Sequence, residues 1–283
     1  MRMWRWCAAG LVAVAFVSGP AWAQQRPLAT EDPETIGVGL ILLEGGMDYA
    51  RDLVFPASGL TGNLLRLPTM GVSVGLSSIA ELQIDGGFHD RLTVTDRQDA
   101  PLSHMLTFEG DRTSSIEDVV IATKIRLAGE TAGRPAFGVR LATKLPNASN
   151  EAGLGLDTTD VYVTALVGKT VQSIRVVGNI GLGILGDPTR GDEQNDVLVY
   201  GISVARAVAV GLEVVGEVNG RAHTASGDPP PGTESRAVMR VGGRYTRGAG
   251  RVDGGLIIGM TSRDPSVGFT LGFTYVFNAF RLP

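Results

Sequence analysis

The sequence predicts an all-β protein: a transmembrane, antiparallel, up-and-down β-barrel of about 12 strands, with short periplasmic turns and longer extracellular loops. Three observations support this fold class. The chain opens with an export signal, it then alternates between apolar and polar residues with a period of two, and its connections alternate between short and long. After Glu34 no long amphipathic helical pattern competes with this interpretation.

The N-terminus has the three parts of a secretory signal peptide. Arg2 and Arg5 precede an apolar stretch from Cys7 to Val17, far shorter than the roughly 20 residues of a membrane-spanning helix. Ala21-Trp22-Ala23 then provides a small-residue cleavage site, so we expect residues 1–23 to be removed on export. Residues 24–33 are predicted to form a short periplasmic segment, and residues 34–283 the barrel in the bacterial outer membrane.

The mature chain would lack cysteine, and loss of the two arginines changes the formal net charge from −4 to −6. Its acidity argues against nucleic acid as a partner. As an outer-membrane channel it would have outer-membrane lipids and a small-molecule solute as partners.

The strand segments are each about the length that a tilted membrane strand requires, roughly 9–11 residues. In the third, Leu82 and Ile84 oppose Glu81, Gln83 and Asp85; the last, Ser266 to Asn278, alternates most strictly. The sixth and eighth are apolar on both faces. In chain order the segments are expected to start near Ile36, Asn63, Ala80, Asp118, Pro135, Asp160, Ser173, Val197, Val210, Ser235, Arg251 and Val267.

The connections carry independent information. Those after even-numbered segments are short, whereas most of those after odd-numbered segments are long and polar. An even strand number with short turns at one end is the layout of a bacterial outer-membrane barrel, with both chain ends on the periplasmic side. The predicted long loops are 52–61, 93–117, 146–159, 187–195 and 223–234.

One motif suggests a competing function. Gly181, Gly183 and Gly186 spell G-x-G-x-x-G after an apolar run, the pattern of a dinucleotide-binding loop. Such a loop must open a helix, yet the polar stretch DPTRGDEQND follows, and the glycines fit the alternation of a strand. We therefore predict a strand and no nucleotide cofactor.

Several segments resemble a family of outer-membrane β-barrels described as meta-pathway phenol-degradation proteins. The resemblance rests on loose motifs over most of the mature chain: residues 30–32, 37–44, 67–75, 80–83, 144–146, 153–157 and 268–275. It implies an outer-membrane barrel and, by association, a channel for small aromatic or hydrocarbon molecules. It supplies no catalytic residues.

In a barrel, the polar phase of each strand must face the lumen, because a charge facing lipid costs about 2–4 kcal/mol near the midplane. Arg236, Arg240 and Arg244 then form a ladder up one strand. These charges either form an electrostatic constriction that orients solutes or pair across strands and close a small lumen. The other expected pore-lining residues are Glu213, Glu217, Arg221, Arg251, Asp253, Arg175, Lys124, Arg126, Arg140, Lys144, Glu81 and Asp85.

Other candidate sites are weaker. Asp187, Asp192, Glu193 and Asp196 share a loop, but their spacing does not match a calcium-binding motif. A hydrolase on the same fold would need a base, and His89 beside Asp90 has no evident nucleophile. We predict no catalytic or metal site and favour a channel for passive uptake, ahead of a non-conducting barrel and then a hydrolase.

Overall fold

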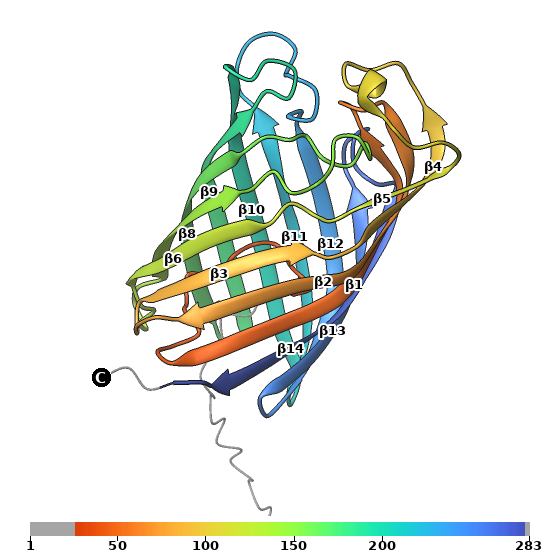
Figure 1. Ribbon diagram of the computed structural model, residues 1–283. Coiled ribbons are helices and arrows are strands. Elements are labelled where there is room, and N and C mark those ends of the chain that lie inside the picture. Colours follow the sequence, from red (N-terminus) through yellow and green to blue (C-terminus); the bar gives the residue numbers. More distant parts are fainter. Residues whose placement is uncertain (1–25, 281–283) are drawn as a thin grey trace, which may run out of the picture.

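A computed structural model describes residues 26–280, so the predicted signal peptide lies outside the described residues. No helix between residues 26 and 280 has both the length and the apolar character to cross a membrane. Residues 26–280 form fourteen strands and one 3-10 turn, η1 (Ser103–Met105) (Figure 1). The strands are β1 (Leu40–Phe55), β2 (Leu60–Gly75), β3 (Ala80–Gly87), β4 (Asp90–Arg97), β5 (Arg112–Ser115), β6 (Val120–Ala128), β7 (Ala136–Lys144), β8 (Asp160–Val171), β9 (Ile174–Gly186), β10 (Gln194–Ala209), β11 (Leu212–His223), β12 (Arg236–Arg247), β13 (Gly250–Gly259) and β14 (Val267–Asn278).

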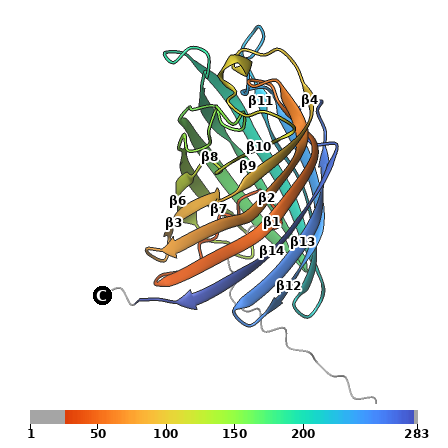
Figure 2. The ribbon, with the colours of Figure 1, turned by 45° about the vertical axis from the view of Figure 1, so that its right-hand side comes forward.

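Twelve of these strands, β1 to β3 and β6 to β14, form a closed antiparallel barrel. Closure comes from β1, which pairs with β2 on one edge and with β14 on the other. The tilt of the strands is visible in both views (Figures 1 and 2). The predicted fold class is therefore confirmed, and most strands begin within three residues of the expected position.

One predicted connection is wrong in part. The expected loop 93–117 contains most of β4 and all of β5, which pair with each other beside the upper part of β2. Residues 69–75 of β2 pair with β3, whereas residues 60–66 pair with β4. The β4 and β5 sequences carry polar residues on both faces, so apolar alternation could not reveal them. Backbone pairing extends the sheet here, and Leu92 of β4 adds apolar packing against β2.

The outer face of the barrel is apolar. On β14, Phe269, Leu271, Phe273 and Tyr275 are 37–55% exposed, while Thr270 and Thr274 between them are buried. The ring of Phe269 stacks on that of Tyr49 of β1, with centroids 5.3 Å apart. An apolar outside and a polar inside are the arrangement expected of a barrel surrounded by lipid.

The glycine motif lies within β9, as the sequence predicted, and Gly186 is the strand's last residue. Gly181 faces inward where β8 passes closely: a Cβ there would lie 2.3 Å from the carbonyl oxygen of Val163. A side chain would push the two strands apart, so this glycine serves wall packing.

The long-loop end of the barrel contains a small apolar core. Leu60, Leu64 and Leu92 are at most 1% exposed and pack against side chains that include Leu106 and Leu154 from two long loops. Backbone and hydroxyl contacts join the loops, including a 2.8 Å hydrogen bond from Ser58 to the carbonyl of Gly153. The loops are therefore packed on the barrel end.

Candidate functional site

The candidate site is the lumen, into which the polar phase of the strands projects. The structure places every predicted pore-lining residue in this inward phase, as their register and mutual contacts show. Opposite charges face each other directly on neighbouring strands. Arg240 pairs with Glu217 and Arg244 with Glu213, each at 2.7 Å, and Lys124 lies 2.9 Å from Glu81.

The lumen also contains residues that precede the first strand: residues 26–33, which were predicted to form a periplasmic segment, and residues 34–39, which were predicted to belong to the barrel. Residues 26–39 run through it, and Thr30 and Glu31 are only 5% and 4% exposed. The backbone N–H groups of Ala29 and Thr30 donate to the Glu217 carboxylate, both at 2.8 Å. On the same stretch of wall, two strands away, Asn179 of β9 both accepts from and donates to the Glu31 backbone, at 2.7 and 2.8 Å. We call residues 26–39 the lumen segment.

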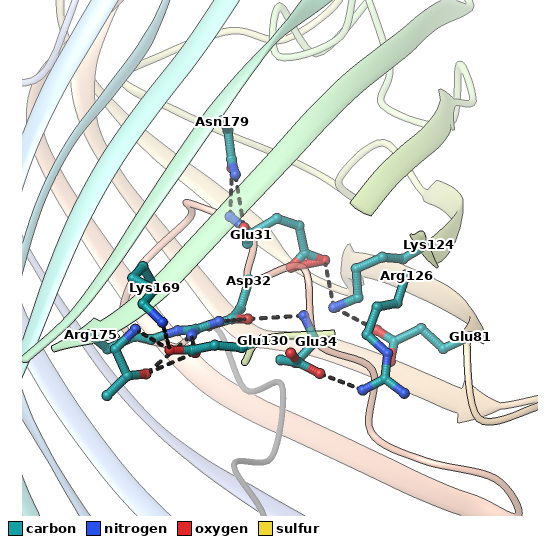
Figure 3. A network of polar contacts seen from close by, with 11 residues as sticks. Glu31, Asp32, Glu34, Glu81, Lys124, Arg126, Glu130, Lys169, Arg175 and Asn179 are labelled. Atoms are coloured by element: carbon teal, nitrogen blue, oxygen red, sulfur yellow. Dashed lines mark hydrogen bonds and ion pairs between the residues drawn. The ribbon is translucent and has the colours of Figure 1, made fainter. Parts of the chain in front are cut away.

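The lumen segment is acidic where the wall is basic (Figure 3). The Glu31 carboxylate lies 3.7 Å from Lys124 and 3.5 Å from Arg140. Lys124 has no exposed side-chain surface, so its two acidic partners, Glu31 and Glu81, provide its charge compensation.

A second group of ion pairs lies nearer the short turns. Asp32 receives two hydrogen bonds from Arg175, at 2.7 and 2.9 Å, and Arg126 contacts Glu34 at 2.5 Å. Arg175 also binds Glu130 in the β6–β7 turn. Partial burial alone would raise the pKa of Glu130, but hydrogen bonds from Thr170 and Lys169, with the charge of Arg175, lower it.

Arg26 anchors the start of the segment on the opposite wall. Its guanidinium donates to the hydroxyls of Thr69 and Thr270, at 3.1 and 2.8 Å. It also lies 3.6 Å from each of Asp48 and Asp253. Asp253 has no exposed side-chain surface and therefore needs nearby positive charge. Arg251 of the wall supplies part of that charge, and Arg26 of the lumen segment supplies more.

The described residues enclose at least two cavities in the lumen. The larger, about 510 Å³, lies toward the long loops. It is lined by charged residues of β1, β2, β7, β11 and β12, by the loop acids Asp118 and Asp264, and by apolar loop residues. The smaller, about 240 Å³, has Ala29, Thr30 and Glu31 of the lumen segment among its lining residues. Of the predicted residues, Arg221, Arg236, Arg240 and Lys144 line the larger cavity and Arg140 the smaller. The others contact the wall, the turns or the lumen segment.

The sequence did not single out the charged residues by which the lumen segment contacts the wall: Arg26, Glu31, Asp32 and Glu34. The available signal was charge. Three acidic residues precede the first strand, and the polar strand faces carry Lys124, Arg126, Arg140 and Arg175 without enough acids beside them in the sequence. That imbalance was consistent with an acidic partner inside the barrel.

The weaker candidates are arranged unfavourably for chemistry. Asp90 is buried and its carboxylate accepts a hydrogen bond from Arg66 at 3.2 Å, whereas the preceding residue, His89, is exposed. In the acidic loop, Asp187 accepts from Thr189 and Arg190 in its own turn, and Glu193 pairs with Arg190. These acids already have protein partners.

No family model and no curated protein matches the chain. Among solved structures it is similar to the COG4313 outer membrane channel from Pseudomonas putida F1, with 15% identity and a TM-score of 0.63 over 87% of this chain and 98% of that one. It is also similar to the autotransporter NalP translocator domain from Neisseria meningitidis, at 13% identity and TM-score 0.48 over 85% and 89%. LpxR from Salmonella typhimurium gives 12% and 0.47 over 83% and 100%. At 15% identity, the likeness to the Pseudomonas putida channel shows a shared barrel fold alone.

Proposed function

We propose that this protein is an outer-membrane channel for the passive uptake of small solutes, including aromatic or hydrocarbon compounds. The observation that carries the proposal is a charged cavity of about 510 Å³ inside a closed barrel with an apolar outer face. A barrel with a purely structural role would be stabilised by filling this volume with side chains. The solved Pseudomonas putida protein of similar fold is itself described as a channel.

The lumen segment determines how such a channel conducts. It crosses the lumen between the cavities and the short turns, and side-chain and backbone hydrogen bonds hold it in place. We propose that it restricts the channel to small solutes and that its displacement widens the path.

A non-conducting barrel that presents its loops to partners is the second candidate. The same segment favours it, because a segment bound at both walls of the lumen can act as a permanent plug.

Planar-bilayer conductance of the refolded mature protein under a salt gradient tests the proposal. We would compare it with a variant lacking residues 24–36 and with the Arg236→Ala/Arg240→Ala/Arg244→Ala variant. A channel predicts stepwise conductance, larger steps in the deletion variant, and a reversal potential that changes when the arginines are removed. If all three proteins were shown to be folded and none gave measurable conductance, the non-conducting barrel would be favoured.

A further inference from the structure

The seam between β11 and β12 contains one pair of residues that breaks its charge pattern. Glu213 faces Arg244 and Glu217 faces Arg240, so two inward pairs, separated by Val215 opposite Gly242, join opposite charges. The next inward pair with charges on both strands, at the long-loop end, places Arg221 opposite Arg236. Like charges directly opposite each other destabilise a sheet, so this pair requires an explanation.

The partners of these two arginines leave their charge largely uncompensated. Arg221 donates to the backbone carbonyls of Gly232 and Glu234, at 2.6 and 2.9 Å. Arg236 donates to the carbonyls of Val54 and Arg263, both at 2.8 Å. A neutral carbonyl orients a guanidinium without neutralising it. The nearest carboxylate to Arg236, that of Asp264, is 4.0 Å away.

Asp264 itself is occupied by its own loop. One of its oxygens accepts from the backbone N–H of Ala237 and from Thr261, including a 2.6 Å bond from the Thr261 hydroxyl. It therefore fixes the turn before β14 and gives Arg236 only a long contact. At the wall of the larger cavity, which both residues line, the two guanidinium groups thus have only long-range counter-charges among the described residues: Asp264 at 4.0 Å from Arg236, and Glu234 farther away.

Apolar groups lie directly beside the paired arginines. Gly232, whose carbonyl binds Arg221, touches Leu156: a Cβ at Gly232 would lie 2.8 Å from that side chain. Val54, whose carbonyl binds Arg236, is followed by Phe55, and both line the cavity together with Leu154. The cavity therefore has a cationic region at Arg221 and Arg236 beside an apolar side. The acids that also line it, Asp48, Asp118 and Asp264, contact Arg26, Lys144 and Thr261 respectively. Its volume of about 510 Å³ falls within the range of small-molecule sites, roughly 300–1,000 Å³.

We infer that Arg221 and Arg236 form a binding site for the carboxylate of a small amphiphilic anion, whose apolar body lies against Leu154, Leu156 and Phe55. This inference names a solute class for the proposed channel and rests on that proposed function for its physiological meaning. Arginine suits the role because its planar guanidinium binds carboxylates through paired hydrogen bonds. A cationic or neutral amphiphile of the same size would leave the like-charged pair uncompensated.

Calorimetric titration of the mature protein in nanodiscs, with empty nanodiscs subtracted, tests the site. Octanoate is the probe, and octylammonium and acetate are its controls. We expect octanoate to bind, octylammonium to show no binding, and acetate to bind at least tenfold more weakly because it lacks the apolar body. Equal binding of octanoate and octylammonium by the wild-type protein would overturn the inference without any variant.

Variants then locate the site. Arg221→Gln/Arg236→Gln should raise the Kd for octanoate at least tenfold, equivalent to about 1.4 kcal/mol, and the single Arg221→Gln change should raise it severalfold. The matched control is Arg190→Gln/Arg247→Gln, which removes two charges from exposed positions and should change the Kd less than twofold. An unchanged Kd in a folded double variant would overturn the assignment. Since binding is measured without conduction, a protein that binds octanoate but does not conduct would refute the proposed function alone.

Discussion

The acidic side chains of the lumen segment bind it to basic residues of the barrel wall, and a charge-removing variant tests how strongly they do so. We consider the double variant Glu31→Gln/Asp32→Asn, which keeps the size of both side chains and removes both charges. In the wild type, Asp32 accepts two hydrogen bonds from Arg175 at 2.7 and 2.9 Å. Glu31 lies 3.7 Å from Lys124 and 3.5 Å from Arg140.

The magnitude follows from these contacts. A hydrogen bond to a charged group contributes about 1.5–3 kcal/mol. Asp32 and Arg175 are about one-fifth exposed, so solvent screening reduces their share. We therefore expect the bound state of the segment to lose about 2–4 kcal/mol in total relative to the released state. At about 1.4 kcal/mol per tenfold, the equilibrium constant for release should rise roughly 30- to 1,000-fold.

Single-channel recording provides the assay. The double variant should show more frequent or longer wide-open events than the wild type, with a shift toward anion selectivity because Lys124, Arg140 and Arg175 lose acidic partners. The matched control is Glu151→Gln/Asp192→Asn, which removes two exposed loop carboxylates and should leave the recordings unchanged.

Recordings from the double variant that match the control would refute this reasoning. If deletion of residues 24–36 nevertheless widened the channel, the segment would be held mainly by its backbone bonds to Glu217 and Asn179.

Three further predictions concern stability and titration. Lys124→Met should cost about 3–5 kcal/mol in urea unfolding, because it leaves Glu81 buried without its cation; a loss below 1 kcal/mol would mean that the pair is not needed. Gly75→Ala should displace the lumen segment and lower stability by about 1–3 kcal/mol, since its Cβ would lie 1.7 Å from the Gly37 carbonyl oxygen. Gly133→Ala, which meets nothing within 4 Å, is its control, and equal effects would contradict the argument. Partial burial works to raise the pKa of Asp187, but hydrogen bonds from Thr189 and Arg190 lower it overall. Its stabilising effect is therefore fully present above the unfolded pKa of about 3.9 and is lost as the pH falls through the lower folded value. A carboxyl NMR titration midpoint at or above about 3.9 would disprove this.

Much of the fold was determined by the sequence alone, because membrane strands encode their environment residue by residue. An apolar side chain at every second position, as in Ser266 to Asn278, specifies both a strand and the face that meets lipid. Since that signal is local, the strand starts, the closed barrel and the inward phase of Arg236, Arg240 and Arg244 follow without knowledge of any long-range contact. The β4 and β5 strands could not be predicted in this way because they carry polar residues on both faces.

Only the tertiary structure decided which partners the inward-facing charged side chains contact. Thr30 binds Glu217, 187 residues later in the chain, and Arg26 binds Thr270, 244 residues later. No period along the sequence records such pairs, and the lumen segment has no alternation of its own. Likewise the register between β11 and β12, which places Arg221 opposite Arg236, depends on backbone pairing between whole strands. The sequence therefore determined which side chains face the lumen, and the closed barrel determined which of them are neutralised and which remain available to a ligand.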